Sequence, residues 1–393
     1  MISEAVGRGA ATADRTSAPH APADGVPALD MRAVVKEFGP VRAVASVDLR
    51  VRRGEFLTLL GPSGSGKTTI LKLIAGFERP TAGQILLDGE DISRLSPAER
   101  GIGVVFQHYA LFPHMTVRDN IAYPLQRRGW TRERCRQRVR EALALVRLEG
   151  FDGRYPRQLS GGQQQRVAVA RALAFHPRLL LMDEPLGALD RALRVEMQEE
   201  LRRIHRESET TVMYVTHDQE EALTLSDRVA ILWDGRLQQV GAPRDLYRAP
   251  ANRLVATFFG ECTLVPARVV ARESESTALV SALGRQFVTR LGGALDGPDA
   301  ALVVRPGKIR LRPAPDDLLL PVTVQDVLYL GDLARVVCLS EAAGQVLVSA
   351  DPDEALGLGL RASLTVGFAA ADTVVVSGQN VRQNIGQNIG QNI

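Results

Sequence analysis

The sequence is poor in cysteine and has no long apolar runs. Its three cysteines, Cys135, Cys262 and Cys338, lie far apart and form no Cys-x-x-Cys pair. A disulfide framework or a zinc site is therefore not expected, and a reducing compartment fits. No apolar run approaches the about 18–20 residues that span a bilayer, and the N-terminus lacks the apolar core of a signal peptide. Any action at a membrane is expected from the cytosolic side, through partner proteins.

The sequence also lacks a strong charge imbalance and is poor in aromatic residues. Lys and Arg number 48 against 45 Asp and Glu, and aromatics make up 5% of the chain. Neither phosphate-backbone binding nor base stacking is favoured by this composition, so no nucleic-acid partner is expected. With 45% hydrophobic residues in a chain of 393, we expect a globular protein of two or three domains.

Four segments differ in their patterns. Residues 1–28 are rich in Ala, Gly, Pro and Thr, which predicts a disordered extension. Residues 29–260 alternate apolar runs with amphipathic stretches, which predicts an α/β domain with a mostly parallel sheet. Residues 261–377 contain short strand-like runs separated by Gly, Pro and Asp, which predicts a small β-barrel or sandwich. Residues 378–393 repeat Gly-Gln-Asn-Ile and are expected to form a low-complexity tail.

Particular elements follow from these patterns. Ser96–Glu99 has the composition of a helix start, with a capping box and Pro at the first helical position. The arginine-rich stretch 127–140 is predicted to form a solvated helix from near Thr131. Apolar runs predict the buried strands 55–60, 102–106, 179–182, 211–216 and 229–233.

The strongest motif is a phosphate-binding loop between a predicted strand and a predicted helix, Thr69–Ala75. It matches Gly-x4-Gly-Lys-Ser/Thr in full. The glycines let backbone N–H groups approach phosphates closely, and the helix N-terminus adds positive potential. Lys67 is expected to reach the β- and γ-phosphates of ATP, and the Thr68 hydroxyl to bind Mg²⁺. The nucleotide-binding residues are predicted to be Gly61, Pro62, Ser63, Gly64, Ser65, Gly66, Lys67, Thr68 and Thr69.

A second motif is the pair of carboxylates at the end of the apolar run 179–182. A buried strand of a parallel sheet delivers its last residues to the crevice where ligands bind. Asp183 is predicted to hold Mg²⁺, and Glu184 to orient and polarise the attacking water.

A third motif separates this chain from other nucleotide-binding loop proteins. Leu159 is followed by Ser160, Gly161, Gly162 and Gln163, directly before a helical stretch. A serine hydroxyl and glycine N–H groups at a helix N-terminus form an anion site, although a plain helix cap has the same composition. As a whole, this motif resembles the signature of the ABC ATPase family, and the resemblance covers nearly all of residues 29–260.

The resemblance implies roles for further residues. Phe38 matches the aromatic residue that stacks on adenine. Gln107 matches the glutamine that contacts Mg²⁺ and water, and the apolar segment 108–115 after it matches the groove that receives a helix of the membrane protein. Asp190 matches the loop that crosses the dimer interface, and His217 matches the switch histidine at the γ-phosphate.

Residues 261–377 resemble the TOBE accessory domain of importer ATPases of the maltose, spermidine and iron types. The motifs 304–306, 309–311 and 329–332 carry this likeness, while Gly307 stands where the family often has an acidic residue. The expected fold is an α/β P-loop NTPase domain with a helical subdomain, followed by a small all-β, OB-like domain.

The resemblance also implies partners and a location. Two copies, or this chain and a second ABC ATPase, are expected to pair head to tail around two ATP molecules. The pair is expected to bind two transmembrane permease subunits at the cytoplasmic face of the bacterial inner membrane, with a periplasmic or surface solute-binding protein outside.

Alternatives from other classes are less favoured. Soluble ABC proteins of DNA repair or chromosome structure insert long coiled coils, and this chain has no sustained heptads. Exporters commonly fuse membrane helices to the ATPase. For the solute, Leu186-Gly187-Ala188 resembles the branch of polyamine and aminoethylphosphonate importers. Polyamines are favoured, and aminoethylphosphonate, ferric iron and sugars stay open.

Overall fold

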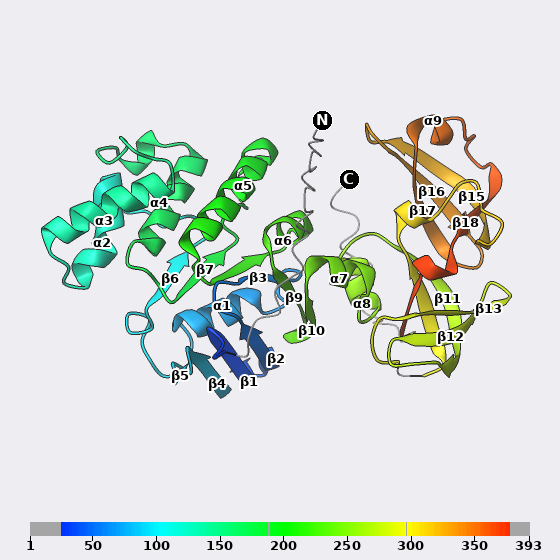
Figure 1. Ribbon diagram of the computed structural model, residues 1–393, viewed down its shortest axis with the longest axis horizontal. Helices are drawn as coiled ribbons and strands as arrows, with labels where there is room; N and C mark the ends of the chain where they lie inside the picture. Colours follow the sequence, from blue (N-terminus) through cyan, green and yellow to red (C-terminus); the bar gives the residue numbers. More distant parts are fainter. Residues whose placement is uncertain (1–24, 188, 296, 378–393) are drawn as a thin grey trace, which may run out of the picture.

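A computed structural model describes residues 25–187, 189–295 and 297–377. Most of the expected terminal segments, 1–28 and 378–393, lie outside the described residues, as does Ala188. We refer to residues 29–260 as the α/β region and to residues 261–377 as the β region. Figure 1 shows the two regions side by side, with the short helices α7 (Pro243–Arg248) and α8 (Arg253–Phe258) between them. No described helix is long and apolar enough to cross a membrane.

A six-stranded sheet forms the centre of the α/β region. Its order is β10-β9-β3-β8-β7-β6, and every pair is parallel except β10 with β9. Five of the strands agree with the predicted runs to within one residue at each end: β3 (Phe56–Leu60), β6 (Ile102–Val105), β7 (Leu179–Asp183), β8 (Val212–Thr216) and β9 (Arg228–Trp233). The edge strand β10 (Arg236–Gly241) was not predicted.

Alternate residues of these strands face two separate cores, as the period of a strand requires. Leu57 and Leu59 of β3 belong to a core shared with α1 (Lys67–Ala75) and an antiparallel sheet. Phe56 belongs instead to the core under the helical side. The antiparallel sheet has the order β2-β1-β4-β5, with β1 (Leu29–Phe38), β2 (Val41–Val51), β4 (Ala82–Leu87) and β5 (Glu90–Asp91).

The predicted helical subdomain lies at one end of the α/β region (Figure 1). Its helices pack around the core that contains Phe56, because each helix has one apolar face. Thr131 caps the arginine-rich helix, as predicted. The helices are α2 (Val117–Arg127), α3 (Arg132–Leu145) and α4 (Gly161–Leu173), followed in the chain by α5 (Arg191–Ser208) and α6 (Gln219–Leu225).

The predicted helix start at Ser96 was wrong. The Glu99 carboxylate does accept hydrogen bonds from the Ser96 N–H at 2.8 Å and from its hydroxyl at 2.6 Å. However, the chain makes only turns there, because Gly101 takes a left-handed φ of 65° and β6 begins at the next residue. The capping interaction therefore closes a turn rather than starting a helix.

The β region has two parts, and one of them is a barrel, the first of the two architectures that the sequence left open. One part is a closed barrel, β11-β12-β13-β19-β14, and the other is a four-stranded antiparallel sheet, β17-β16-β15-β18. One apolar core joins them. The barrel strands are β11 (Thr263–Arg272), β12 (Thr277–Ala282), β13 (Arg285–Leu291), β14 (Asp299–Val304) and β19 (Val374–Ser377). The sheet contains β15 (Leu318–Tyr329), β16 (Ala334–Ser340), β17 (Gly344–Ala350) and β18 (Ser363–Phe368), with the helix α9 (Pro352–Ala355) nearby.

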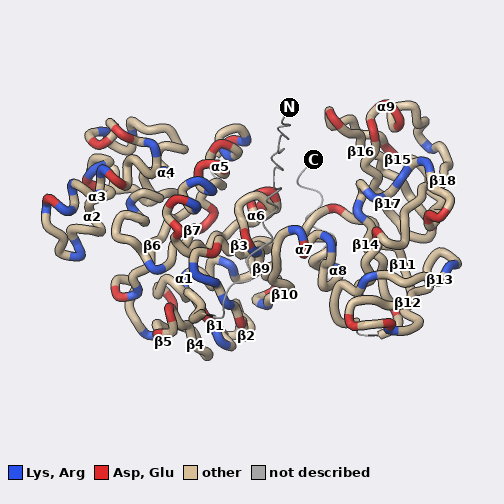
Figure 2. Tube along the Cα trace, viewed as in Figure 1, with Lys and Arg blue, Asp and Glu red and all other residues tan. Residues whose placement is uncertain are grey.

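Charges of both signs are interspersed over the described chain. Figure 2 shows segments of Lys and Arg and segments of Asp and Glu scattered over both regions. This distribution agrees with the small net charge of +3.

Candidate functional site

The predicted site residues come together because parallel strands end at the same edge of a sheet. Gly61 follows β3, Gln107 lies two residues after β6, Glu184 follows β7 and His217 follows β8. Because β3, β8, β7 and β6 are neighbours in that order, all four positions lie along one edge.

Glycines shape the phosphate-binding loop. A Cβ at Gly61 would lie 2.3 Å from the Leu232 carbonyl oxygen, and one at Gly66 would lie 2.4 Å from that of Ala43. Gly66 also has a φ of 103°, which favours glycine. It precedes α1 without a side-chain cap, so the first N–H groups of this helix are available to a ligand. The buried Ser65 hydroxyl has no hydrogen-bond partner in the described structure.

Lys67 is folded back against the loop. Its side chain is buried, and its Nζ donates to the carbonyl oxygens of Gly61 at 2.7 Å and Pro62 at 2.9 Å. Burial lowers the pKa of Lys67, while the nearby carboxylates of Glu184 and Asp183 oppose that shift. One of its three N–H donors thus remains for an anion.

Asp183 is half-buried at the end of β7. Burial raises the pKa of this carboxyl, and the neighbouring Glu184 carboxylate raises it further. The Thr68 hydroxyl and Lys67 act in the opposite direction. A carboxylate that is destabilised by burial and by a like charge favours a nearby cation.

Glu184 lies between two polar side chains. Its Oε1 is 3.2 Å from His217 Nδ1, and its Oε2 is 3.5 Å from Gln107 Nε2. Its backbone has a left-handed φ of 43°, which is costly for a non-glycine residue. The side chains of Gln107 and His217, after β6 and β8, therefore both contact the carboxylate of Glu184, after β7.

The signature segment caps α4. The Ser160 hydroxyl accepts from the Gln163 N–H at 3.3 Å, and Gln163 Oε1 accepts from the Ser160 N–H at 3.0 Å. Gly161 and Gly162 pack against Leu189 and the start of α5. Among the hydrogen bonds and ion pairs of the described residues, none joins this segment to the phosphate-binding loop.

Two further predicted residues lie outside this cluster. Asp190 caps α5, because its carboxylate accepts from the Leu193 N–H at 2.9 Å. Phe38 ends β1 with 46% of its surface exposed, and the Lys36 ammonium lies 4.7 Å from its ring centre. The exposed ring of Phe38 can take part in stacking, whereas the Asp190 carboxylate is used in a helix cap.

The comparisons with known proteins agree with this geometry. Residues 44–187 match the ABC transporter family, and residues 302–376 match the TOBE domain. The spermidine/putrescine import ATP-binding protein PotA of Chromobacterium violaceum is 48% identical over 327 residues, covering 82% of this chain and 90% of that protein. The chain belongs to the importer-type ABC transporter ATP-binding subunits. The predicted resemblance, fold class and enzyme class, an ATP hydrolase coupled to transport, are thereby confirmed.

Other relatives give the same result. The protein of the same description from Acidothermus cellulolyticus is 47% identical over 339 residues, covering 84% of this chain and 88% of that protein. Among solved structures, cbiO1 from Clostridium perfringens, part of the ABC transporter complex cbiONQ, has a TM-score of 0.53 at 27% identity. That match covers 56% of this chain and 90% of the cbiO1 chain. It therefore supports the fold of the α/β region.

The residues of this ABC subunit fit a hydrated Mg²⁺. The described residues contain no cluster of three or more His, Cys, Asp or Glu side chains that could hold a metal. Mg²⁺ needs no such cluster, because it keeps several waters and uses one or two carboxylates together with substrate phosphates. Asp183, whose pKa is raised, and the Thr68 hydroxyl beside it supply a donor set of this kind.

One group of residues in this ABC subunit was not found from the sequence. Tyr109 and Ala110, just after Gln107, have left-handed φ values of 58° and 47°. Both of their carbonyl oxygens accept hydrogen bonds of 2.9 Å from Arg171, which belongs to α4. A basic residue among the apolar residues of α4 was the only available signal, and it does not identify backbone acceptors.

A second unpredicted group is the buried Glu221. Its Oε2 accepts from the hydroxyls of Tyr214 and Thr216, both at 2.7 Å. These bonds fix the end of β8 directly before His217. Glu221 thus fixes the backbone that leads into His217.

Proposed function

We propose that the chain binds Mg²⁺ and ATP at the carboxyl edge of its central sheet and hydrolyses ATP in a head-to-tail dimer. The observation that carries this proposal is the position of Glu184 between Gln107 and His217, at the end of the strand beside the phosphate-binding loop. This arrangement can hold a water molecule against a terminal phosphate.

The proposed chemistry is the attack of that water on the γ-phosphorus. Glu184 orients the water and accepts its proton as the P–O bond to the β-phosphate breaks, giving ADP and phosphate. Lys67 exchanges its bonds to the loop carbonyls for bonds to phosphate oxygens. Asp183 and Thr68 would hold Mg²⁺, which would neutralise phosphate charge. Gln107 and His217 position the water and the γ-phosphate, and Phe38 stacks on adenine.

The dimer follows from the position of the signature segment. Ser160, Gly161, Gly162 and Gln163 present a helix N-terminus but make no described hydrogen bond to the loop of their own chain. We propose that this segment binds the phosphates held by a second copy, and that Asp190 lies at the interface. ATP then joins two copies, and its hydrolysis separates them.

The decisive variant is Glu184→Gln. We expect it to bind ATP and to accumulate as an ATP-bound dimer, while phosphate release falls by about 10²–10⁴-fold, the usual contribution of a general base. Light scattering during gel filtration with ATP measures the dimer, and a phosphate-release assay measures turnover.

The matched control is Glu220→Gln, which removes an exposed carboxylate from α6 outside the site. It should leave turnover within about twofold of the unmodified chain, the range typical of surface substitutions. Near-normal hydrolysis by Glu184→Gln would refute the base assignment.

For the transported solute we propose polyamines, spermidine and putrescine. Relatives that bear this description in several bacteria are 42–49% identical to this chain. The chain would then work at the cytoplasmic face of the inner membrane with two permease subunits and a solute-binding protein. Segment 108–115 is the proposed contact with the permease.

Uptake by cells tests the solute. Cells lacking the gene should lose uptake of labelled putrescine or spermidine, and the intact gene, but not its Glu184→Gln form, should restore it. If uptake of aminoethylphosphonate is lost instead, polyamine transport is refuted although ATP hydrolysis stands.

A further inference from the structure

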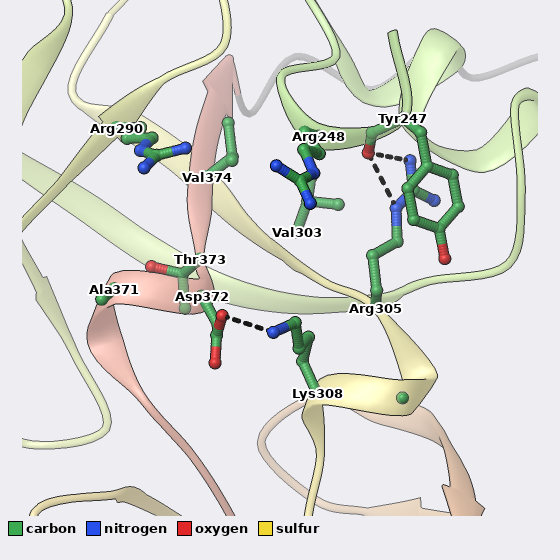
Figure 3. Close-up of a pocket in the computed structure, with 11 residues that line it drawn as sticks. Tyr247, Arg248, Arg290, Val303, Arg305, Lys308, Ala371, Asp372, Thr373 and Val374 are labelled. Atoms are coloured by element: carbon green, nitrogen blue, oxygen red, sulfur yellow. Dashed lines mark hydrogen bonds and ion pairs between the residues drawn. The ribbon is translucent and has the colours of Figure 1, made fainter. Parts of the chain in front are cut away.

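A cleft of about 400 Å³ lies between α7 and the barrel, away from the nucleotide site. Figure 3 shows its walls: α7 contributes Tyr247 and Arg248, β13 contributes Arg290, and the end of β14 contributes Arg305. This volume falls in the range of about 300–1,000 Å³ that is typical of small-molecule sites. The residues that line the cleft thus come from both the α/β region and the β region.

The lining of the cleft has a strong excess of positive charge. Four cationic side chains, Arg248, Arg290, Arg305 and Lys308, face a single carboxylate, Asp372. That carboxylate is already paired, because Lys308 Nζ lies 3.0 Å from its Oδ1. Three positive charges remain without a carboxylate in the lining. This contrasts with the interspersed charges of the rest of the chain.

Arg305 supplies a positive charge that is fixed in place. Its guanidinium donates five hydrogen bonds, all to backbone carbonyl oxygens: two to Tyr247 and one each to Ala256, Gly260 and Glu261. Burial lowers the pKa of Arg305. Three of these bonds are made by Nη1 and only one by Nη2, so one N–H of Nη2 has no acceptor among the described residues, and the charge has no counter-ion there.

Arg248 and Arg290 differ from Arg305, because both are exposed. Neither side chain makes a hydrogen bond or an ion pair within the part of the chain that the structure describes. Figure 3 shows their guanidinium groups directed toward one another across the cleft, near Val374. Two facing guanidinium groups repel each other unless an anion lies between them, and their planar N–H donors match the oxygens of carboxylates and phosphates.

Gly307 lines the cleft without a side chain. A Cβ at this position would meet no atom within 4 Å, and the glycine does not have a left-handed φ. No steric or backbone requirement therefore selects glycine here. An acidic side chain at Gly307 would fit and would compete for the cations of the cleft.

We propose that this cleft binds a small anion with at least two negative charges, carried by phosphate or carboxylate groups. The anion bridges Arg248 of the α/β region and Arg290 and Lys308 of the β region. The site is independent of ATP binding, because none of its residues belongs to the nucleotide site.

The test uses isothermal titration calorimetry on the full chain at about 150 mM salt, where unspecific surface attraction is screened. Citrate is the carboxylate probe and pyrophosphate is the phosphate probe. Both are titrated without Mg²⁺. The pyrophosphate titration uses the Lys67→Met background, so that the phosphate-binding loop does not compete. Binding of either probe supports the proposal and identifies the preferred group.

Matched variants locate the binding. Gly307→Glu should weaken binding at least tenfold, equivalent to about 1.4 kcal/mol, because it adds a carboxylate to the cleft. Gly307→Ala makes the same backbone change without the charge and should alter binding less than twofold. Arg248→Gln with Arg290→Gln should also weaken it tenfold. Arg268→Gln removes an exposed barrel arginine outside the cleft and should have no effect.

Two results would overturn the proposal. One is the absence of binding by both probes. The other is binding that is unchanged by Gly307→Glu and by the double arginine variant, which would place the anion elsewhere. Circular dichroism melting of each variant confirms that a loss of binding does not reflect a loss of fold.

Discussion

A buried cation of the α/β region, Lys67, and one at the boundary with the β region, Arg305, lie in similar environments. Lys67 is 6% exposed and Arg305 is 8% exposed. Burial lowers the pKa of both side chains, and both donate to backbone carbonyl oxygens. Burial and charge alone therefore do not distinguish a ligand-binding cation from a structural one.

The surroundings do distinguish them. Lys67 makes two bonds within a glycine loop and has the acidic groups of Asp183 and Glu184 nearby. Arg305 makes five bonds, which connect α7, the end of α8 and the start of the β region. Lys67 can replace its two bonds to carbonyl oxygens by bonds to a ligand. The second holds two parts of the chain together.

The largest expected effect is on ATP turnover in Lys67→Met. We expect a loss of at least about 10²-fold, the usual effect of removing one donor to a transition-state oxygen. The melting temperature should not fall, because methionine buries a similar volume without a desolvated charge. Phosphate release and thermal melting measure the two effects. A variant that melts much earlier than the unmodified chain would show that Lys67 is structural like Arg305.

The reverse result is expected for Arg305→Met. Four carbonyl groups lose their buried donor, and the expected loss of stability is about 2–4 kcal/mol. Urea unfolding measures this loss, with Arg268→Met as the surface control. The nucleotide site is distant, so phosphate release per folded molecule should change less than twofold. If stability were unchanged, the five bonds would have no net structural effect.

A smaller effect on the free energy of unfolding is expected for Asp183→Asn. The raised pKa of Asp183 means that the folded state holds its proton more tightly than the unfolded state, whose value is near 3.8. The contribution of this group to stability therefore decreases as pH rises from about 4 through the folded pKa.

Asp183→Asn should remove this pH dependence and stabilise the ligand-free protein by about 1 kcal/mol at pH 7, although it loses Mg²⁺-dependent hydrolysis. Urea unfolding of the unmodified chain and of the variant at pH 4 and pH 7 measures the difference in their stability. If Asp183→Asn lowered the stability equally at both pH values, the prediction would be wrong.

Much of the fold could be predicted because buried parallel strands are continuous apolar runs. The runs before Gly61, Glu184 and His217 needed no tertiary information. In contrast, β1 was missed because bulges interrupt its alternation, with Ala33 at a left-handed φ of 46°. The strands β18 and β19 were missed because they pair with distant strands of the β region.

The site residues could be proposed from motifs, since phosphate chemistry requires those residue types at fixed spacing. Their supports could not. Arg171 and Arg305 both donate to backbone carbonyl oxygens. Every residue has such an oxygen, so the sequence does not indicate which one is the acceptor. The charged residues of the cleft come from separate elements between Arg248 and Asp372, so only the fold assembles the cleft.

The two bonds from Arg171 have a kinetic consequence. Left-handed backbone at Tyr109 and Ala110 costs roughly 1–2 kcal/mol per residue, and the guanidinium of α4 offsets that cost. We therefore expect the turn after Gln107 and the last turn of α4, which contains Arg171, to open together rather than separately. Their amide protons should exchange with solvent at a common rate, so that a movement of either element is transmitted to the other.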